Sequence, residues 1–334
     1  MPQSPNLIVS ATPLALSRDP PSLDTWIDQL SICLKLLSSD DTGGCQLPDK
    51  SACNADEFKF LQEIMHLPDQ RIPFRDSAPS RHRVLQDPNG PFSRSHLRTR
   101  HGFFSILVLR ALLHSTDFLF LKGNRILFES YDDFNGVIQE VAREKNWDIH
   151  STRFCKPDAY GRHSGVSVSI GNAKAYWDAS GKDCNTSWLI EGKDISFRKL
   201  VGLLAGNEFP GIGKLQALQI ATDYARAGII QPTEDEFLEG IRYVNMGAVA
   251  GLMDLGLLER KFKMKQVNGR LARAKDKSQV NREDLKSAFV AVKVAVEEKW
   301  DSTNYPWDMF ELEHWLCKAS PRRLGRESYY QIYE

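Results

Sequence analysis

The segment 197–228 constrains the fold of this chain more than any other part of the sequence. Two stretches of helical period are joined there by the short turn Phe-Pro-Gly-Ile-Gly at 209–213. Gly211 and Gly213 can adopt backbone angles that other residues rarely take, and they let a phosphate approach the main chain. The first N–H groups of the second helix, together with Lys214, would form an anion site. The segment therefore predicts two packed helices with such a site at their junction.

This arrangement resembles the helix-hairpin-helix motif. In that motif Ile212 would pack between the two helices, and Ala217 would permit them to cross closely. Phosphate contacts of this kind position a nucleic acid without reading its sequence. A plain turn between two helices, with no ligand, is the alternative.

Most of the remaining chain also has a helical period. We expect helices at 23–38, 55–66, 96–114, 130–146, 194–205, 214–227, 233–242, 246–257, 283–300 and 306–318. The stretch 67–95 contains five prolines and predicts an extended, arginine-rich connection. The stretch 160–192 predicts a short hairpin or an irregular loop, and 260–282 a basic insertion. The predicted fold class is mainly α, with a small irregular or β insertion.

The chain divides into five predicted segments. They are a disordered N-terminus at 1–22, a helical part at 23–150, a loop or small β insertion at 151–193, a second helical part with the glycine turn at 194–320, and a tail at 321–334.

The net charge excludes a strongly basic nucleic-acid binder, because Lys+Arg and Asp+Glu are 43 each. The charge is nevertheless uneven. Seven arginines stand against two aspartates in 71–101, and ten basic residues against four acidic ones in 259–286. Such patches bind phosphate, or they are solvated faces and loops.

Other classes of protein are excluded by what the sequence lacks. It has no run of about 18 apolar residues, so we expect no membrane span. The N-terminus lacks the basic region of a secretory signal, so we expect an intracellular protein, nuclear if the organism is eukaryotic. The run 260–282 suits a nuclear address, a DNA-binding arm or only a loop. The six cysteines form no CxxC pair, so we expect free thiols, and neither a metal nor a cofactor.

Four blocks of sequence carry a family resemblance. They are FPGIGKLQALQIATD, MGAVAGLMDLG, ELEHWLC and FFSILVLRALL. Together they resemble the α-glutamyl/putrescinyl-thymine pyrophosphorylases, a divergent branch of the helix-hairpin-helix DNA glycosylase superfamily. They also resemble the related helical domain of the 5-hydroxymethyluracil DNA kinases. The blocks are short and span about residues 70–320. Lys318 stands where the family has an acidic residue. The resemblance implies a glycosylase-like helical fold.

The resemblance also implies a reaction. Pyrophosphate leaves the exocyclic carbon of a modified 5-hydroxymethyl pyrimidine, in DNA or in a nucleotide, and an amine takes its place. Such a reaction needs cations for the leaving anion, a group that controls protons and a pocket for an extruded base. The implied catalytic residues are Asp223, Arg110, Glu313 and Cys317. The residues expected to bind phosphate or DNA are Gly211, Gly213, Lys214, Arg98 and Arg100.

Each catalytic candidate has a structural alternative. Asp223 would orient the amine or act as a base, or it would cap a helix or pair with an arginine. Arg110 lies on an apolar helix, where a buried guanidinium needs Asp223, Glu313 or a phosphate as partner. Cys317 would attack the pyrimidine ring, or it is a small core residue. Two other functions also fit the sequence: a DNA-binding protein of this fold without catalysis, and the same fold acting on a small molecule.

Overall fold

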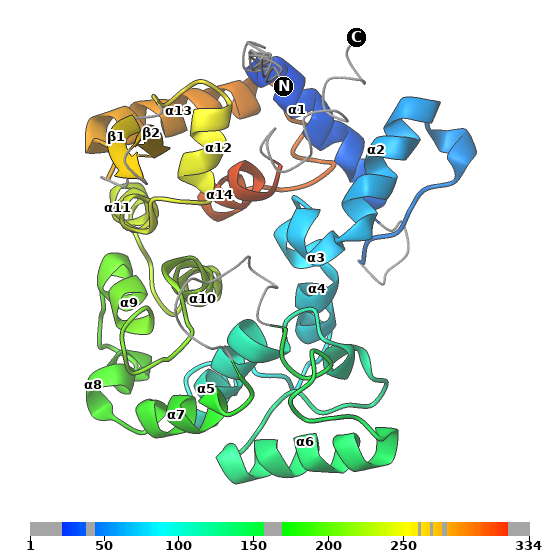
Figure 1. Cartoon of the computed structure of the whole chain (residues 1–334), viewed down its shortest axis with the longest axis vertical. Helices are drawn as coiled ribbons and strands as arrows, with labels where there is room; N and C mark the ends of the chain where they lie inside the picture. Colours follow the sequence, from blue (N-terminus) through cyan, green and yellow to red (C-terminus); the bar gives the residue numbers. More distant parts are fainter. Residues whose placement is uncertain are drawn as a thin grey trace, which may run out of the picture.

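The computed structural model describes residues 22–37, 44–156, 169–259, 262–267, 270–275 and 279–319. In these ranges the chain is mainly helical, with fourteen α-helices and two strands (Figure 1). The predicted mainly α fold class is confirmed. The helices are α1 Leu23–Cys33, α2 Ala55–His66, α3 Pro68–Arg71, α4 Pro79–Leu85, α5 Arg100–Val108, α6 Tyr131–Lys145, α7 Asn172–Ser180, α8 Asp183–Thr186, α9 Phe197–Leu204, α10 Lys214–Arg226, α11 Glu234–Val244, α12 Ala248–Asp254, α13 Arg282–Lys299 and α14 Met309–Lys318.

Helix α10 lies in the middle of the fold (Figure 1). Every residue from Leu215 to Ala225 is buried. A helix that is buried on all sides must contact neighbours all round, and α10 packs against α9, α11 and the π-helical turn Leu109–Leu113. Its polar residues, which include Gln219 and Asp223, are therefore also inside the protein.

The stretch 67–95 is more helical than the sequence prediction of an extended connection. It contains α3, α4 and a 3₁₀ turn at Arg75–Ser77. Pro68 and Pro79 occupy the first position of α3 and α4, where the missing N–H has no helical partner to lose. The prolines thus begin helices here.

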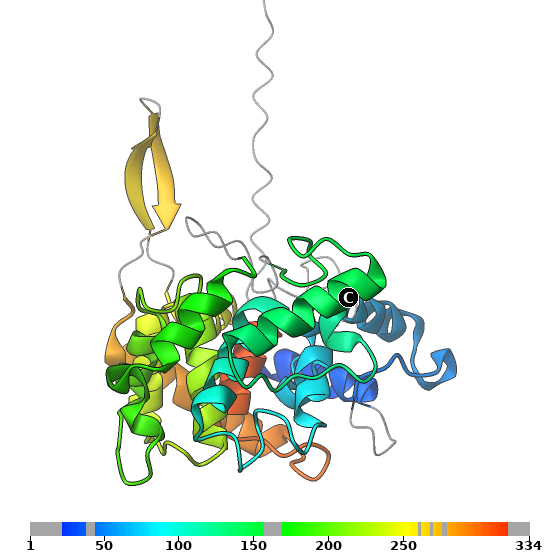
Figure 2. The same ribbon diagram turned by 90° about the horizontal axis from the view of Figure 1, so that it is seen from below.

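The prediction for one non-helical segment was wrong. Residues 169–192, expected as a hairpin or loop, contain α7 and α8, while 157–168 lie outside the described residues. The strands instead fall in the basic insertion: β1 Phe262–Val267 pairs antiparallel with β2 Arg270–Lys275. The two strands project from the helical body in Figure 2. The dipeptide Asn-Gly at 268–269, typical of two-residue hairpins, was the overlooked signal.

The second and third motif blocks pack against each other as α12 and α14. A Cβ atom on Gly251 would lie 2.1 Å from the carbonyl oxygen of Leu316. One on Gly247, whose φ is +64°, would lie 3.1 Å from Sγ of Cys317. Both glycines are thus explained by the close approach of two helices.

The apolar core joins the beginning and the end of the described chain. Trp26 on α1 is fully buried, and its indole Nε1 donates to the carbonyl of Ala319 after α14, at 3.0 Å. Among the described helices we find none with both the length and the apolar character needed to cross a membrane. The predicted N-terminal segment 1–22, apart from Ser22, and the tail 321–334 lie outside the described residues.

Candidate functional site

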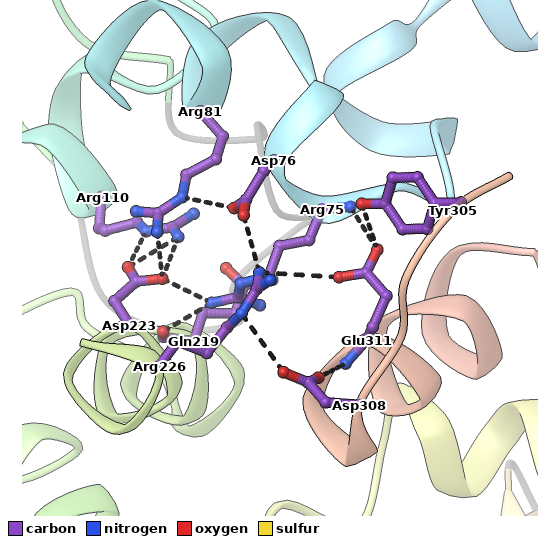
Figure 3. A network of polar contacts seen from close by, with 10 residues as sticks. All are labelled: Arg75, Asp76, Arg81, Arg110, Gln219, Asp223, Arg226, Tyr305, Asp308 and Glu311. Carbon is purple, nitrogen blue, oxygen red and sulfur yellow. Dashed lines mark hydrogen bonds and ion pairs between the residues drawn. The ribbon is translucent and has the colours of Figure 1, made fainter. Parts of the chain in front are cut away.

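Asp223 on α10 is the centre of a buried cluster of charges (Figure 3). Arg110 donates to both of its carboxylate oxygens, from Nε at 2.8 Å and from Nη2 at 2.7 Å. Arg75 donates from Nη2 at 2.7 Å, and Nη2 of Arg81 lies 3.4 Å away. Three guanidinium groups therefore share one carboxylate, and all three are at most 7% exposed.

The three arginines come from three separate elements. Arg75 lies in the 3₁₀ turn after α3, Arg81 on α4 and Arg110 in the π-helical turn that ends α5. A π-helical turn is a rare form that occurs frequently at functional sites. Because these elements are more than 100 residues from α10 in the sequence, Asp223 joins parts of the fold that local sequence does not connect.

Asp223 is held in its ionised form. Burial alone would raise the pKa of its carboxyl, but Arg110, Arg81 and Arg75 outweigh that effect and hold the pKa well below its ordinary value. A carboxylate so strongly stabilised is a weak base. The structure therefore shows the ion pair with arginine that was one of the structural alternatives for Asp223. The Asp223 carboxylate holds the arginine side chains in position.

A second layer of charges surrounds Arg75. Its backbone N–H donates to Oε1 of Glu311 on α14 at 2.8 Å, and the hydroxyl of Tyr305 donates to the same oxygen at 3.1 Å. Burial raises the pKa of Glu311 to about 7. Nearer the surface, Arg226 pairs with Asp76 at 2.9 Å. The cluster thus extends from α10 to α14 and outward.

A narrow pocket opens beside Arg81 and Arg110. It is lined by Ser80, Arg81, Val84, Phe92, Leu109, Arg110, His114 and Leu119. Its cavity volume of about 10 Å³ is room for about one water molecule. Nη1 of Arg81 is buried without a hydrogen-bond partner, and the ring of Phe92 covers the guanidinium, with Cζ 4.3 Å from the ring centroid.

The polar wall of this pocket is held in place by hydrogen bonds to Asp69. Ser80 donates to Asp69 from its N–H and its hydroxyl, and the hydroxyl of Ser115 donates to Oδ2 at 2.6 Å. Nδ1 of His114 lies 3.1 Å from that hydroxyl. Burial, opposed by Asp69, lowers the pKa of His114 to about 3, so its imidazole is neutral at neutral pH.

Of the four candidate catalytic residues, the structure brings Arg110 and Asp223 into direct contact. The expectation that Arg110 finds a carboxylate partner is confirmed. Glu313 and Cys317 are buried on α14. The α14 carboxylate that accepts from the backbone N–H of Arg75 is that of Glu311, two residues before the one chosen from the sequence. Cys317 packs against Gly247, which fits the alternative interpretation of Cys317 as a small core residue.

The glycine turn has the expected positive φ at Gly211 but not at Gly213, whose φ is −78°. Gly211 has a φ of +83°, Ile212 is buried, and α10 begins at Lys214. The ammonium of Lys214 donates to the carbonyl of Tyr243 at 3.2 Å and lies 4.0 Å from the centroid of that ring. Gly213 donates its N–H to the side chain of Gln216. Binding of phosphate or DNA at this turn remains a prediction.

Arg98 and Arg100 both make contacts with other residues of the chain. Arg98 donates to the carbonyl of Leu189 at 3.1 Å. Arg100 donates to the carbonyl of Trp177 and stacks on its ring at 3.7 Å. These contacts fasten the start of α5 to the segment 177–189. Neither residue belongs to the cluster around Asp223, and their contact with DNA also remains a prediction.

Sequence reasoning missed Arg75, Arg81, His114 and Glu311. The arginine-rich run 71–101 was recognised, but as a surface patch or a loop. Arg75 and Arg81 are instead buried. The apolar residues that alternate with these arginines, including Ile72, Phe74 and Val84, are core residues and were the available signal.

In the described part of the chain, no three His, Cys, Asp or Glu residues are grouped so as to hold a metal ion. All six cysteines are free thiols, as expected. Comparison with known protein families, with curated proteins and with solved structures found no match. The resemblance to the pyrophosphorylases therefore rests on the four sequence blocks.

Proposed function

We propose that this chain is a base-modifying enzyme of DNA or nucleotides that displaces pyrophosphate from a modified 5-hydroxymethyl pyrimidine in favour of an amine. The observation that carries the proposal is the group of three buried arginines that share Asp223, two of which also line a pocket. The sequence blocks that contain Arg110 and Asp223 are those that resemble the pyrophosphorylases.

Buried cations suit the chemistry of this displacement. The amine nitrogen forms a bond to the exocyclic carbon while the bond from that carbon to the pyrophosphate oxygen breaks. Pyrophosphate leaves with the electron pair, and the amine loses a proton to solvent or to a nearby base. Negative charge therefore grows on the leaving oxygen, and guanidinium groups already fixed beside it lower the barrier.

Asp223 has a positioning role in this proposal. It holds Arg110 by two hydrogen bonds and Arg75 by one, so their donors keep one geometry before the ligand arrives. Because its pKa is depressed, Asp223 is not the group that takes the proton from the amine. Arg81 and Arg110, which line the pocket, are the residues that would face the pyrophosphate.

The glycine turn supports DNA as the carrier of the modified base. Gly211, with its positive φ, lies just before the start of α10, and that same helix carries Asp223 nine residues after Lys214. A phosphate held at this helix start would place the duplex at the N-terminal end of the helix that carries the cluster. An enzyme acting on a base in a duplex must then extrude it.

Two rival functions remain in view. A DNA-binding protein without catalysis would use the turn but not the buried arginines. An enzyme acting on a small molecule would use the arginines but not the turn, and the zero net charge of the chain favours this second rival.

A titration of the protein with two duplexes, at two salt concentrations, separates these functions. One duplex carries pyrophosphorylated 5-hydroxymethyluracil, and the other has thymine at that position. We expect tighter binding of the modified duplex and an affinity that falls steeply with salt. Equal affinity for both duplexes supports the non-catalytic rival. Absence of binding to either contradicts the role of DNA.

A further inference from the structure

We infer that the pocket between α4 and the π-helical turn is a binding site for a tetrahedral oxyanion, with Arg81 as its principal donor. The identification of this oxyanion as one end of pyrophosphate rests on the proposed function. Free phosphate and a phosphoryl group of a larger ligand share this chemistry.

Arg81 supplies the first argument. Its Nε contacts Asp76 at 3.2 Å and its Nη2 contacts Asp223 at 3.4 Å, but Nη1 has no hydrogen-bond partner. The residue is 7% exposed, so bulk solvent has little access to Nη1. A buried charged donor without an acceptor is costly. An oxyanion in the pocket would accept from Nη1.

The charges around the pocket favour an anion over any cation. Arg81 and Arg110 both line it, whereas no aspartate or glutamate does. The carboxylate of Asp223, which contacts both of these arginines, is already shared by three guanidinium groups. His114 is neutral and adds a polar contact. A ligand with negative oxygens is thus the chemistry that this wall recognises.

The remaining walls differ in how firmly they are held. Ser80 is fixed to Asp69 by two hydrogen bonds. Phe92 is half-buried, and its ring stacks on the Arg81 guanidinium. The cavity of about 10 Å³ is smaller than a phosphate group, so one wall has to move. We expect the Phe92 side chain to move, because the incoming anion would replace the Phe92 ring as the partner of the Arg81 guanidinium.

Calorimetric titration with inorganic phosphate and with pyrophosphate tests this site without DNA. The wild-type chain is compared with Arg81→Gln and with the control Arg153→Gln, an exposed arginine that pairs with Asp117 at 3.2 Å. We expect pyrophosphate to bind the wild type and the control equally, and Arg81→Gln at least tenfold more weakly. No binding to the wild type, or equal binding to Arg81→Gln, overturns the inference.

A second variant covers the case in which Arg81→Gln does not fold. Phe92→Ala leaves both ion pairs of Arg81 in place and removes the ring that covers its guanidinium. We expect phosphate and pyrophosphate to bind this variant severalfold more tightly than the wild type. Unchanged or weaker binding contradicts the role of Phe92 and with it the site as described.

The two proposals fail in different ways. If pyrophosphate binds at Arg81 but no amine displaces it from the modified duplex, the proposed function is wrong and the oxyanion site stands. If the displacement proceeds at the wild-type rate in Arg81→Gln, the oxyanion site is wrong and the proposed function stands. Tighter binding of pyrophosphate than of phosphate identifies the larger ligand as the source.

Discussion

Arg110 contacts Asp223 at two points, with Nε 2.8 Å from Oδ2 and Nη2 2.7 Å from Oδ1. The two residues are 113 positions apart in the sequence. Parallel hydrogen bonds of this kind fix the plane of a guanidinium as well as its position. Asp223 contacts Arg75 and Arg81 as well, so this one carboxylate determines how three cations are arranged.

Replacing the Asp223 carboxylate tests how much it contributes to the stability of the fold. Asp223→Asn keeps the shape of the side chain but leaves three buried guanidinium groups without their common counter-charge. We expect a loss of about 3–5 kcal/mol in the free energy of unfolding, measured with urea. Asp178→Asn, in an exposed pair with Lys174, is the control and should change it by less than about 1 kcal/mol. Equal effects would mean that the cluster does not hold the fold together.

The raised pKa of Glu311 predicts how stability depends on pH. The ordinary glutamate pKa of 4.5 is raised to about 7 by burial in the folded chain. The folded state therefore binds a proton at Glu311 more tightly than the unfolded state does. The stability that this protonation adds is lost as pH rises from 4.5 through 7. The expected loss is on the order of 3 kcal/mol.

Glu311→Gln isolates this contribution, because the amide keeps an oxygen for Arg75 and Tyr305 but does not ionise. The difference in unfolding free energy between the variant and the wild type should grow in favour of the variant as pH rises from 4.5 to 7. A difference that stays constant across this range would rule out a raised pKa at Glu311.

The close contact of α12 with α14 predicts the effect of a single methyl group. Gly251→Ala places a Cβ atom 2.1 Å from the Leu316 carbonyl oxygen, so the helices must separate. We expect thermal or urea unfolding to show a loss of about 2–3 kcal/mol. Gly136 on α6 has nothing within 4 Å of such an atom, and Gly136→Ala should stabilise the chain by up to about 1 kcal/mol. Similar effects of both substitutions would contradict the packing described.

The glycine turn predicts a change in DNA affinity. Lys214→Glu reverses an exposed charge at the start of α10, and we expect severalfold weaker binding to duplex DNA at low salt, with a shallower dependence on salt. Lys145→Glu, exposed on α6, is the matched control. Unchanged binding by Lys214→Glu would leave the turn as a purely structural connection.

The sequence predicted the helices well where their apolar period is uninterrupted. The stretch 55–66 is α2, and 130–146 differs from α6 only at its ends. The prediction of secondary structure from the sequence was wrong where local signals conflict. Proline suggested an extended chain at 67–95, although at the first position of α3 and α4 it begins a helix.

The candidate site was predictable only in part. A partner for Arg110, with Asp223, Glu313 or a phosphate as candidates, could be predicted because a charged residue on an apolar helix requires one. Arg75 and Arg81 could not be assigned in the same way, because which arginines of 71–101 turn inward depends on packing against α10 and α14. Likewise, Glu311 and Glu313 lie on the same helix, and only the tertiary structure distinguishes the one that reaches Arg75.

Release of pyrophosphate is the most direct measure of the proposed displacement. The protein is mixed with a duplex that carries pyrophosphorylated 5-hydroxymethyluracil, and released pyrophosphate is quantified with and without a panel of primary amines. We predict amine-dependent release by the wild type and by Arg153→Gln, and at least a hundredfold slower release by Arg110→Gln, since removing one such charged donor costs about 3–4 kcal/mol in the transition state. No amine-dependent release by the wild type, or equal release by Arg110→Gln, would contradict the account.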